Sequence, residues 1–163
     1  MDSSNGELVS NHEKQANIIN KHFSSIFTSD DGKQPTFVPR IDQHTFLDNI
    51  DFSVDKVRKV LLSLKPSLSA GPDGIPNIVL YCSCFPLSYV FEASFSTYCL
   101  FSDWLQAIVT PVFKKGSVTD PNNYRPISLT CTSCRVMKKV INSQLIDYLL
   151  QNNLITRHQH GFL

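Results

Sequence analysis

The segment from Trp104 to Leu129 constrains the fold of this chain more than any other part of it. It reads WLQAIVTPVFKKGSVTDPNNYRPISL, and its first half contains an apolar run rich in β-branched residues, 107–113. Two lysines and a turn composition of glycine, aspartate, proline and asparagine follow, before a second extended run at 124–129. Two short β-prone runs around such turn residues predict a β-hairpin.

This hairpin would carry three cations, with Lys114 and Lys115 at its tip and Arg125 on its return strand. Arginine offers a planar fork suited to bidentate phosphate contact, whereas lysine gives a mobile point charge. Pro126 restricts the backbone beside Arg125 and so helps to fix the direction of the guanidinium. The pattern favours a polyphosphate clamp. The alternative is two solvated lysines at a loop tip and a surface arginine.

Length and charge set the class of protein. The chain has 163 residues, 42% apolar and 18% charged, which is typical of one globular domain and not of a disordered chain. The net charge of +1 argues weakly against a dedicated nucleic-acid binder. Yet residues 1–103 hold eight basic and twelve acidic side chains, whereas residues 104–163 hold seven and two. This split favours a basic face that meets phosphates, with a chance imbalance as the alternative.

The first ten residues, MDSSNGELVS, lack the basic and apolar stretches of a signal peptide. No apolar run approaches the roughly 18 residues that a membrane span needs. Five cysteines without a secretory signal indicate reduced thiols, because an odd number does not suit a disulfide framework. We therefore expect an intracellular protein of the cytoplasm, the nucleus or both, without a membrane partner.

The N-terminal part predicts two helices joined by a polar linker. Ser10-Asn11-His12-Glu13 is a capping-box pattern with Ser10 as the cap, and apolar residues recur behind it at helical spacing to about Thr28. The segment 29–49 is rich in linker residues. Ser53 then caps a second helix that ends before Pro66.

Helical spacing also predicts the elements farther along the chain. Pro76 opens a short helix, and a largely buried helix covers the apolar residues between Leu87 and Phe101. After the hairpin, Thr132 or Ser133 caps a long helix that ends at the asparagine pair 152–153.

The segment 65–76, KPSLSAGPDGIP, is too rich in proline, glycine and serine to be regular. Gly71 to Gly74 should form a tight turn, with Pro72 fixing φ and Gly74 free to take a positive φ. Asp73 is expected to bond its own turn amides or to cap the following helix.

Four segments resemble, in order and at family-like spacing, the reverse transcriptases of non-LTR (LINE-type) retrotransposons. They are SLSAGPDGIP, DWLQAIVTPVFKKGS, DPNNYRPISL and HQHGF. The resemblance implies an α+β fold, the mainly helical fingers subdomain of a right-hand polymerase with a small antiparallel β-hairpin, and no palm. It also implies a connector helix and linker at 1–50, followed by a partial reverse transcriptase domain at 51–163.

The resemblance assigns roles to particular residues. In these enzymes a lysine and an arginine of the fingers hairpin touch the triphosphate of the incoming nucleotide. The matching positions are Lys114, Lys115 and Arg125. The positions matched to loops near the template and the nucleotide are Gly71, Asp73, Gly74, Gln159 and Gly161. The implied partners are an RNA template, a DNA primer and a deoxynucleoside triphosphate.

Polymerase chemistry uses two divalent cations held by acidic side chains. In this family those carboxylates lie in the palm, beyond the segment matched by QHGF, so we expect neither a catalytic residue nor a metal ligand here. Mg²⁺ is expected for the complete enzyme alone. The adjacent pair Asp30-Asp31 should be a solvated turn. The expected function is a fragment of an RNA-directed DNA polymerase that makes no DNA by itself, with a non-catalytic nucleic-acid-binding or interaction module as the alternative.

Cysteine spacing raises a second chemistry. Cys131 and Cys134 have the spacing of a zinc ligand pair, and His158 and His160 follow at a distance. No glycine-rich knuckle surrounds either pair, so we expect reduced core cysteines instead.

Overall fold

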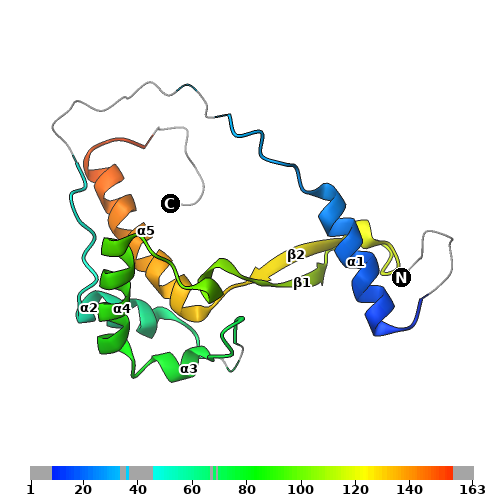
Figure 1. Cartoon of the computed structure of the whole chain (residues 1–163), viewed down its shortest axis with the longest axis horizontal. Helices are drawn as coiled ribbons and strands as arrows, with labels where there is room; N and C mark the ends of the chain where they lie inside the picture. Colours follow the sequence, from blue (N-terminus) through cyan, green and yellow to red (C-terminus); the bar gives the residue numbers. More distant parts are fainter. Residues whose placement is uncertain (1–8, 34–35, 37–45, 67, 69, 156–163) are drawn as a thin grey trace. The chain divides into compact units, whose positions relative to one another are not determined.

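The computed structural model describes residues 9–33, 36, 46–66, 68 and 70–155. These residues form five α-helices, two short 3-10 helices and two strands, in keeping with the expected α+β class (Figure 1). The elements are α1 (His12–Ile26), α2 (Val54–Ser63), α3 (Asn77–Leu80), α4 (Cys84–Thr97), η1 (Ser102–Leu105), β1 (Ile108–Phe113), η2 (Pro121–Asn123), β2 (Tyr124–Leu129) and α5 (Thr132–Gln151). No helix in the described ranges is both long and apolar enough to cross a membrane.

Backbone contacts divide the chain into two compact units. Residues 1–37 and 109–129 form one, which contains α1 and the β1–β2 pair and is called the hairpin unit. Residues 38–108 and 130–163 form the other, which contains the remaining helices and is called the helical unit. The domain boundary that the family resemblance predicts at residue 50 stays a prediction. Units defined by contacts in space need not coincide with the domains of a sequence family.

The helical unit is built on a hydrophobic core to which α2, α4 and α5 contribute. Val57, Phe91 and Val136 have no exposed surface at all, and Leu61 and Val140 are almost as deeply buried. Burying a side chain of this kind contributes about 1.5–3 kcal/mol. The core therefore holds these three helices together.

Aromatic packing joins η1 to this core. The Trp104 ring lies 5.9 Å from that of Phe91, and its indole N–H donates to the Ser133 hydroxyl at 3.0 Å. The Phe52 ring meets Phe91 edge-on at 6.1 Å. Each ring thus buries a large apolar surface while the one polar atom of Trp104 keeps a partner.

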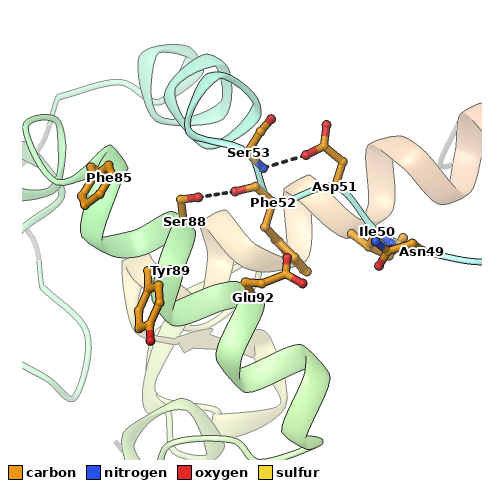
Figure 2. A pocket seen from close by; sticks show the side chains of 9 residues that line it. All are labelled: Asn49, Ile50, Asp51, Phe52, Ser53, Phe85, Ser88, Tyr89 and Glu92. Atoms are coloured by element: carbon orange, nitrogen blue, oxygen red, sulfur yellow. Dashed lines mark hydrogen bonds between the residues drawn. The ribbon is translucent and has the colours of Figure 1, made fainter.

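The segment before α2 is fixed by polar contacts. The Asp51 carboxylate accepts from the Ser53 amide at 2.7 Å, and this bond lowers the pKa of Asp51 (Figure 2). The Ser88 hydroxyl of α4 donates to the Phe52 carbonyl. The Gln144 side chain of α5 bonds both the amide and the carbonyl of Asp51, at 2.9 and 3.0 Å.

A cavity of about 460 Å³ lies beside this segment (Figure 2). Its walls hold two carboxylates, Asp51 and Glu92, and no basic side chain. Its full lining is Asn49, Ile50, Asp51, Phe52, Ser53, Phe85, Ser88, Tyr89 and Glu92. This charge does not suit a phosphate ligand.

Two helix caps differ from the prediction. The cap of α1 is Asn11 and not Ser10, because the Asn11 side-chain oxygen accepts from the Lys14 amide at 3.1 Å and starts the helix one residue later. The cap of α5 is Cys131, whereas Thr132 is wholly buried in the first turn. Ser53 does stand at the cap of α2, but without a side-chain cap bond.

The helix α4 ends earlier than predicted. It stops at Thr97 because Tyr98 takes a left-handed conformation with φ of 56°. The Cys99 amide then bonds the Ser94 carbonyl, and the Ser94 hydroxyl donates to the Cys99 carbonyl. The consequence is that Tyr98 and Phe101, expected in the buried stripe, are exposed.

Candidate nucleic-acid interface

The predicted hairpin is confirmed, with strands at the expected residues and an ordered loop between them. The Lys114 amide donates to the Asn123 carbonyl at 2.7 Å and closes the loop. The Asn123 side-chain amide donates to the Ser117 carbonyl, and the Tyr124 hydroxyl donates to the Val118 carbonyl, both at 2.9 Å. Hydrogen bonds from its own polar groups therefore order the ten-residue loop between the two strands.

The one acidic side chain of this loop, Asp120, is engaged locally. Its carboxylate accepts from the Asn122 amide at 2.9 Å and from the Asn122 side chain at 2.8 Å. These bonds hold the pKa of Asp120 below its ordinary value. Pro121 occupies the first turn of η2, where its fixed φ suits the tight geometry. Asp120 therefore stabilises the conformation of the loop. None of the described ion pairs includes it.

All three predicted nucleotide-binding cations are exposed. Lys114 and Lys115 directly follow β1, and Arg125 is the second residue of β2. In the part of the chain that the structure describes, none of them forms an ion pair. The ion pairs there are Lys33–Asp31 at 3.6 Å and Arg58–Asp55 at 3.2 Å. The hairpin thus presents three cations that no described ion pair neutralises, against the single carboxylate of Asp120.

The two faces of β2 differ in their surroundings. Side chains alternate along a strand, so Arg125 lies on the face opposite to Tyr124 and Pro126. The Tyr124 ring meets the Phe113 ring edge-on at 5.5 Å. Lys114, Tyr124 and Pro126 also line a cavity shared with α1, described next.

Sequence reasoning missed a cavity in the hairpin unit. It measures about 290 Å³, and residues of α1, the residue after it and the hairpin form its walls. The lining residues are His22, Phe23, Ile26, Phe27, Lys114, Asn122, Tyr124 and Pro126. The one signal in the sequence was the aromatic-rich end of α1, which we had assigned to a connector.

The predicted turn at Gly71–Gly74 is present in the helical unit. The Gly74 amide bonds the Gly71 carbonyl at 3.0 Å, and Gly74 takes the expected positive φ, +67°. Asp73 accepts from the Ile75 amide at 3.1 Å, which confirms its structural role in the turn. Proximity of Gly71, Asp73 and Gly74 to a template stays a prediction.

Gly71 has a packing role that the sequence did not reveal. A Cβ atom added to Gly71 would lie 2.7 Å from the Cys131 backbone and 2.7 Å from the Thr130 carbonyl oxygen. Backbone atoms cannot move aside as a flexible side chain can, so the turn can approach the start of α5 only without a side chain at this position.

The remaining predicted positions, Gln159 and Gly161, lie outside the described residues, as do His158 and His160. Cys131 and Cys134 are buried, as expected of core cysteines, and the Cys131 thiol donates to the Asp103 carbonyl at 3.2 Å. Burial raises the pKa of this thiol. Among the residues with described positions, no three acidic, histidine or cysteine side chains gather to hold a metal.

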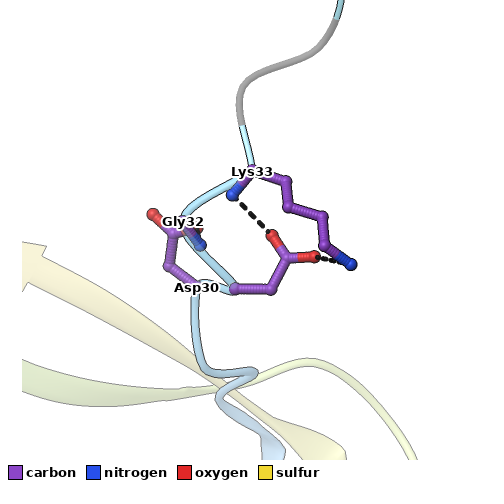
Figure 3. Close-up of polar contacts among 4 residues, drawn as sticks. Asp30, Gly32 and Lys33 are labelled. Carbon is purple, nitrogen blue, oxygen red and sulfur yellow. Dashed lines mark hydrogen bonds and ion pairs between the residues drawn. The ribbon is translucent and has the colours of Figure 1, made fainter.

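The pair Asp30-Asp31 forms a solvated turn, as predicted (Figure 3). Asp30 accepts from the Gly32 amide at 2.9 Å, and Asp31 accepts from the Lys33 amide at 3.1 Å. The Asp31 and Lys33 side chains, 3.6 Å apart, are 65% and 85% exposed. Both carboxylates therefore bond local amides in solvent.

Comparison with known proteins gives a distant relative. No family model matches the chain. A Drosophila melanogaster protein described as a "probable RNA-directed DNA polymerase from transposon BS" is 24% identical over 173 aligned positions. The match covers 96% of the chain and 18% of the length of that protein. This likeness supports a relationship between the chain and the reverse transcriptases of transposons.

Proposed function

We propose that this chain is part of the RNA-directed DNA polymerase of a non-LTR retrotransposon and forms its fingers region. The observation that carries the proposal is the ordered hairpin with three exposed cations, in no described ion pair, at the positions expected from the family motifs. The distant likeness to a transposon polymerase over 96% of the chain supports it.

In this proposal the hairpin holds the triphosphate of the incoming deoxynucleotide. A triphosphate carries about four negative charges, and a planar guanidinium can bind two of its oxygens at once. Arg125 would make that contact, and Lys114 and Lys115 would add mobile positive charge. Because loop bonds already fix the backbone at Lys114, little ordering of the main chain would accompany binding.

The turn at Gly71–Gly74 would lie beside the RNA template, and Gln159 and Gly161 would lie beside the nucleotide. Close approach of a backbone to a strand needs residues without bulky side chains. A DNA primer completes the set of partners that the family resemblance suggests.

We further propose that these 163 residues alone do not synthesise DNA. Polymerisation needs carboxylates that converge on two metal ions, and the Asp30-Asp31 carboxylates instead bond their own turn amides in solvent. Mg²⁺ would act with palm carboxylates in a complete enzyme. Incorporation of labelled deoxynucleotides by the purified chain on a primed RNA template, with Mg²⁺ or Mn²⁺, would contradict this proposal.

Triphosphate binding tests the hairpin directly. Calorimetric titration with dTTP should show about tenfold weaker binding for Arg125→Ala, because one charge-assisted bidentate contact is lost. Lys114→Ala should weaken binding by a smaller factor. The matched control is Arg58→Ala, which removes the same charge from an arginine already paired with Asp55. Equal affinities of the Arg125 and Arg58 variants would refute the triphosphate contact.

The excess positive charge of the hairpin also favours a second candidate, a non-catalytic module that binds nucleic acid. Phosphate contacts release counterions, so RNA binding by such a module should weaken steeply as salt rises. Salt-dependent RNA binding by the folded chain, without any dTTP binding, would select the module. Binding of dTTP that depends on Arg125 would select the polymerase fingers.

A further inference from the structure

The cavity between α1 and the hairpin has aromatic walls, and one of its rings, that of Tyr124, is anchored by contacts. The Tyr124 ring is anchored at its hydroxyl by the Val118 carbonyl, at 2.9 Å, and at its edge by the Phe113 ring. Phe23 and Phe27 also line the cavity; Phe23 is buried, whereas Phe27, the residue after α1, is 73% exposed. A large aromatic side chain left in water, in the same cavity as an anchored ring, offers a surface suited to stacking by a flat ligand.

The same cavity holds groups that complement a phosphate and a base edge. Lys114 supplies an ammonium group without a described ion pair. Asp120 of the same loop stays ionised, because hydrogen bonds from Asn122 lower its pKa, but none of the described ion pairs joins it to Lys114. His22 and Asn122 add polar side chains to the walls. An uncharged apolar ligand would use the rings and leave Lys114 without a partner.

The size and the charge of the cavity limit the class of ligand that it can bind. At about 290 Å³ the cavity is close to the lower end of the roughly 300–1,000 Å³ typical of small-ligand sites. Aromatic platforms interleaved with cations are the physical basis of single-strand binding, because every base has a flat face and every linkage a negative charge. The cavity can hold one unit of such a strand.

We infer that this cavity binds one unpaired nucleotide of a single strand, with its base against Phe27 and Tyr124 and its phosphate at Lys114. The inference deepens the proposed function and rests on it for the class of ligand. It gives α1 a share in the binding surface. The site shares Lys114 with the proposed triphosphate contact and differs from it at Arg125, which lies on the other face of β2.

The experiment uses single strands of about ten nucleotides, of RNA and of DNA, each with one central 2-aminopurine. Wild-type protein should quench the 2-aminopurine emission and bind an abasic version of the strand more weakly. Phe27→Ala should weaken binding of the intact strand about tenfold and reduce the quenching, since the base loses one of its two aromatic partners. Phe27→Tyr, which keeps an aromatic ring, should bind the strand and quench the emission as the wild-type protein does. A preference for RNA or for DNA would identify the strand, and either supports the site.

The matched control is Phe85→Ala, because Phe85 is also 73% exposed but lies in the helical unit beside an acidic cavity. Equal binding and quenching by the Phe27→Ala and Phe85→Ala variants would overturn the inference. If that happened while Arg125→Ala still weakened dTTP binding, the proposed function would stand without this site. If Phe27→Ala weakened strand binding as expected and Arg125→Ala left dTTP binding unchanged, the strand site would be supported and the triphosphate contact would be refuted.

Discussion

The two units of this chain are stabilised in different ways. The helical unit has a continuous core of ten buried apolar side chains from the segments around α2, α3, α4 and α5. In the described part of the hairpin unit, Ile19 and Phe23 alone are buried, and both strands are exposed along almost their whole length. In the hairpin unit, local hydrogen bonds order the loop, and little burial of apolar surface is added to them.

This difference separates stability from binding. Burial of apolar surface supplies most of the free energy of folding, whereas loop polar groups mainly fix local geometry. The cations proposed to bind nucleotide lie in the unit with the smaller core. We therefore expect the hairpin unit to open locally at a lower free energy than the helical unit.

The largest expected effect tests the core of the helical unit. Phe91→Ala should lower the free energy of unfolding by about 3–5 kcal/mol, because it leaves a cavity among fully buried neighbours. Phe85→Ala, on the same helix but exposed, should change it by about 0.5 kcal/mol or less. Urea denaturation followed by circular dichroism measures both, and similar midpoints would show that no such core exists.

A somewhat smaller effect tests the close approach at Gly71. Gly71→Ala should destabilise the helical unit by about 1–3 kcal/mol, since its Cβ would meet backbone atoms at 2.7 Å. Gly74→Ala meets no atom within 4 Å, and its positive φ should limit the cost to about 1 kcal/mol. If thermal denaturation ranked Gly74→Ala as the more damaging change, the packing at Gly71 would be wrong.

In the hairpin unit the expected effects are modest. Tyr124→Phe removes the hydrogen bond to the Val118 carbonyl and should destabilise the loop by about 1 kcal/mol. Amide hydrogen exchange at Lys114, whose N–H closes the loop, would report the change. Tyr89→Phe, in an exposed position of the helical unit, serves as control. Exchange at Lys114 that is as fast in wild type as in Tyr124→Phe would mean that the bond does not order the loop.

The smallest expected effect is on the pH dependence of the loop. The pKa of Asp120 is lowered in the folded state by bonds from Asn122, so this stabilisation is complete above the unfolded pKa. It should be lost as pH falls through the lowered pKa, that is, in strongly acidic solution. The Asn122 amide resonance should follow this titration, and Asp120→Asn should abolish it. A titration midpoint above the ordinary aspartate value would contradict the assigned hydrogen bonds.

Much of the local structure could be predicted from the sequence, because short-range chemistry determines it. Both strands lie where the apolar runs and turn residues placed them, and Gly74 takes the positive φ that its turn requires. The caps were less predictable, since several neighbouring polar residues can cap a helix. At α5, burial of Thr132 and of the Cys131 thiol moved the cap by one residue.

The relations across the chain could not be predicted in the same way. The close approach of Gly71 to Cys131 joins positions 60 residues apart, and no local pattern signals it. The cavity between α1 and the hairpin likewise depends on how two distant segments pack. Lys114 and Arg125 were singled out correctly as exposed cations, but their different surroundings emerged only from the structure.

The chain has a single tryptophan, and Trp104 lies in the helical unit, packed on Phe91 and bonded to Ser133. The intrinsic fluorescence of Trp104 therefore reports on the unfolding of the helical unit and not on that of the hairpin unit. A thermal unfolding curve followed by this fluorescence would show a single transition even if the hairpin unit had already unfolded. In a fluorescence experiment, a second chromophore placed in the hairpin would reveal whether the two units unfold together.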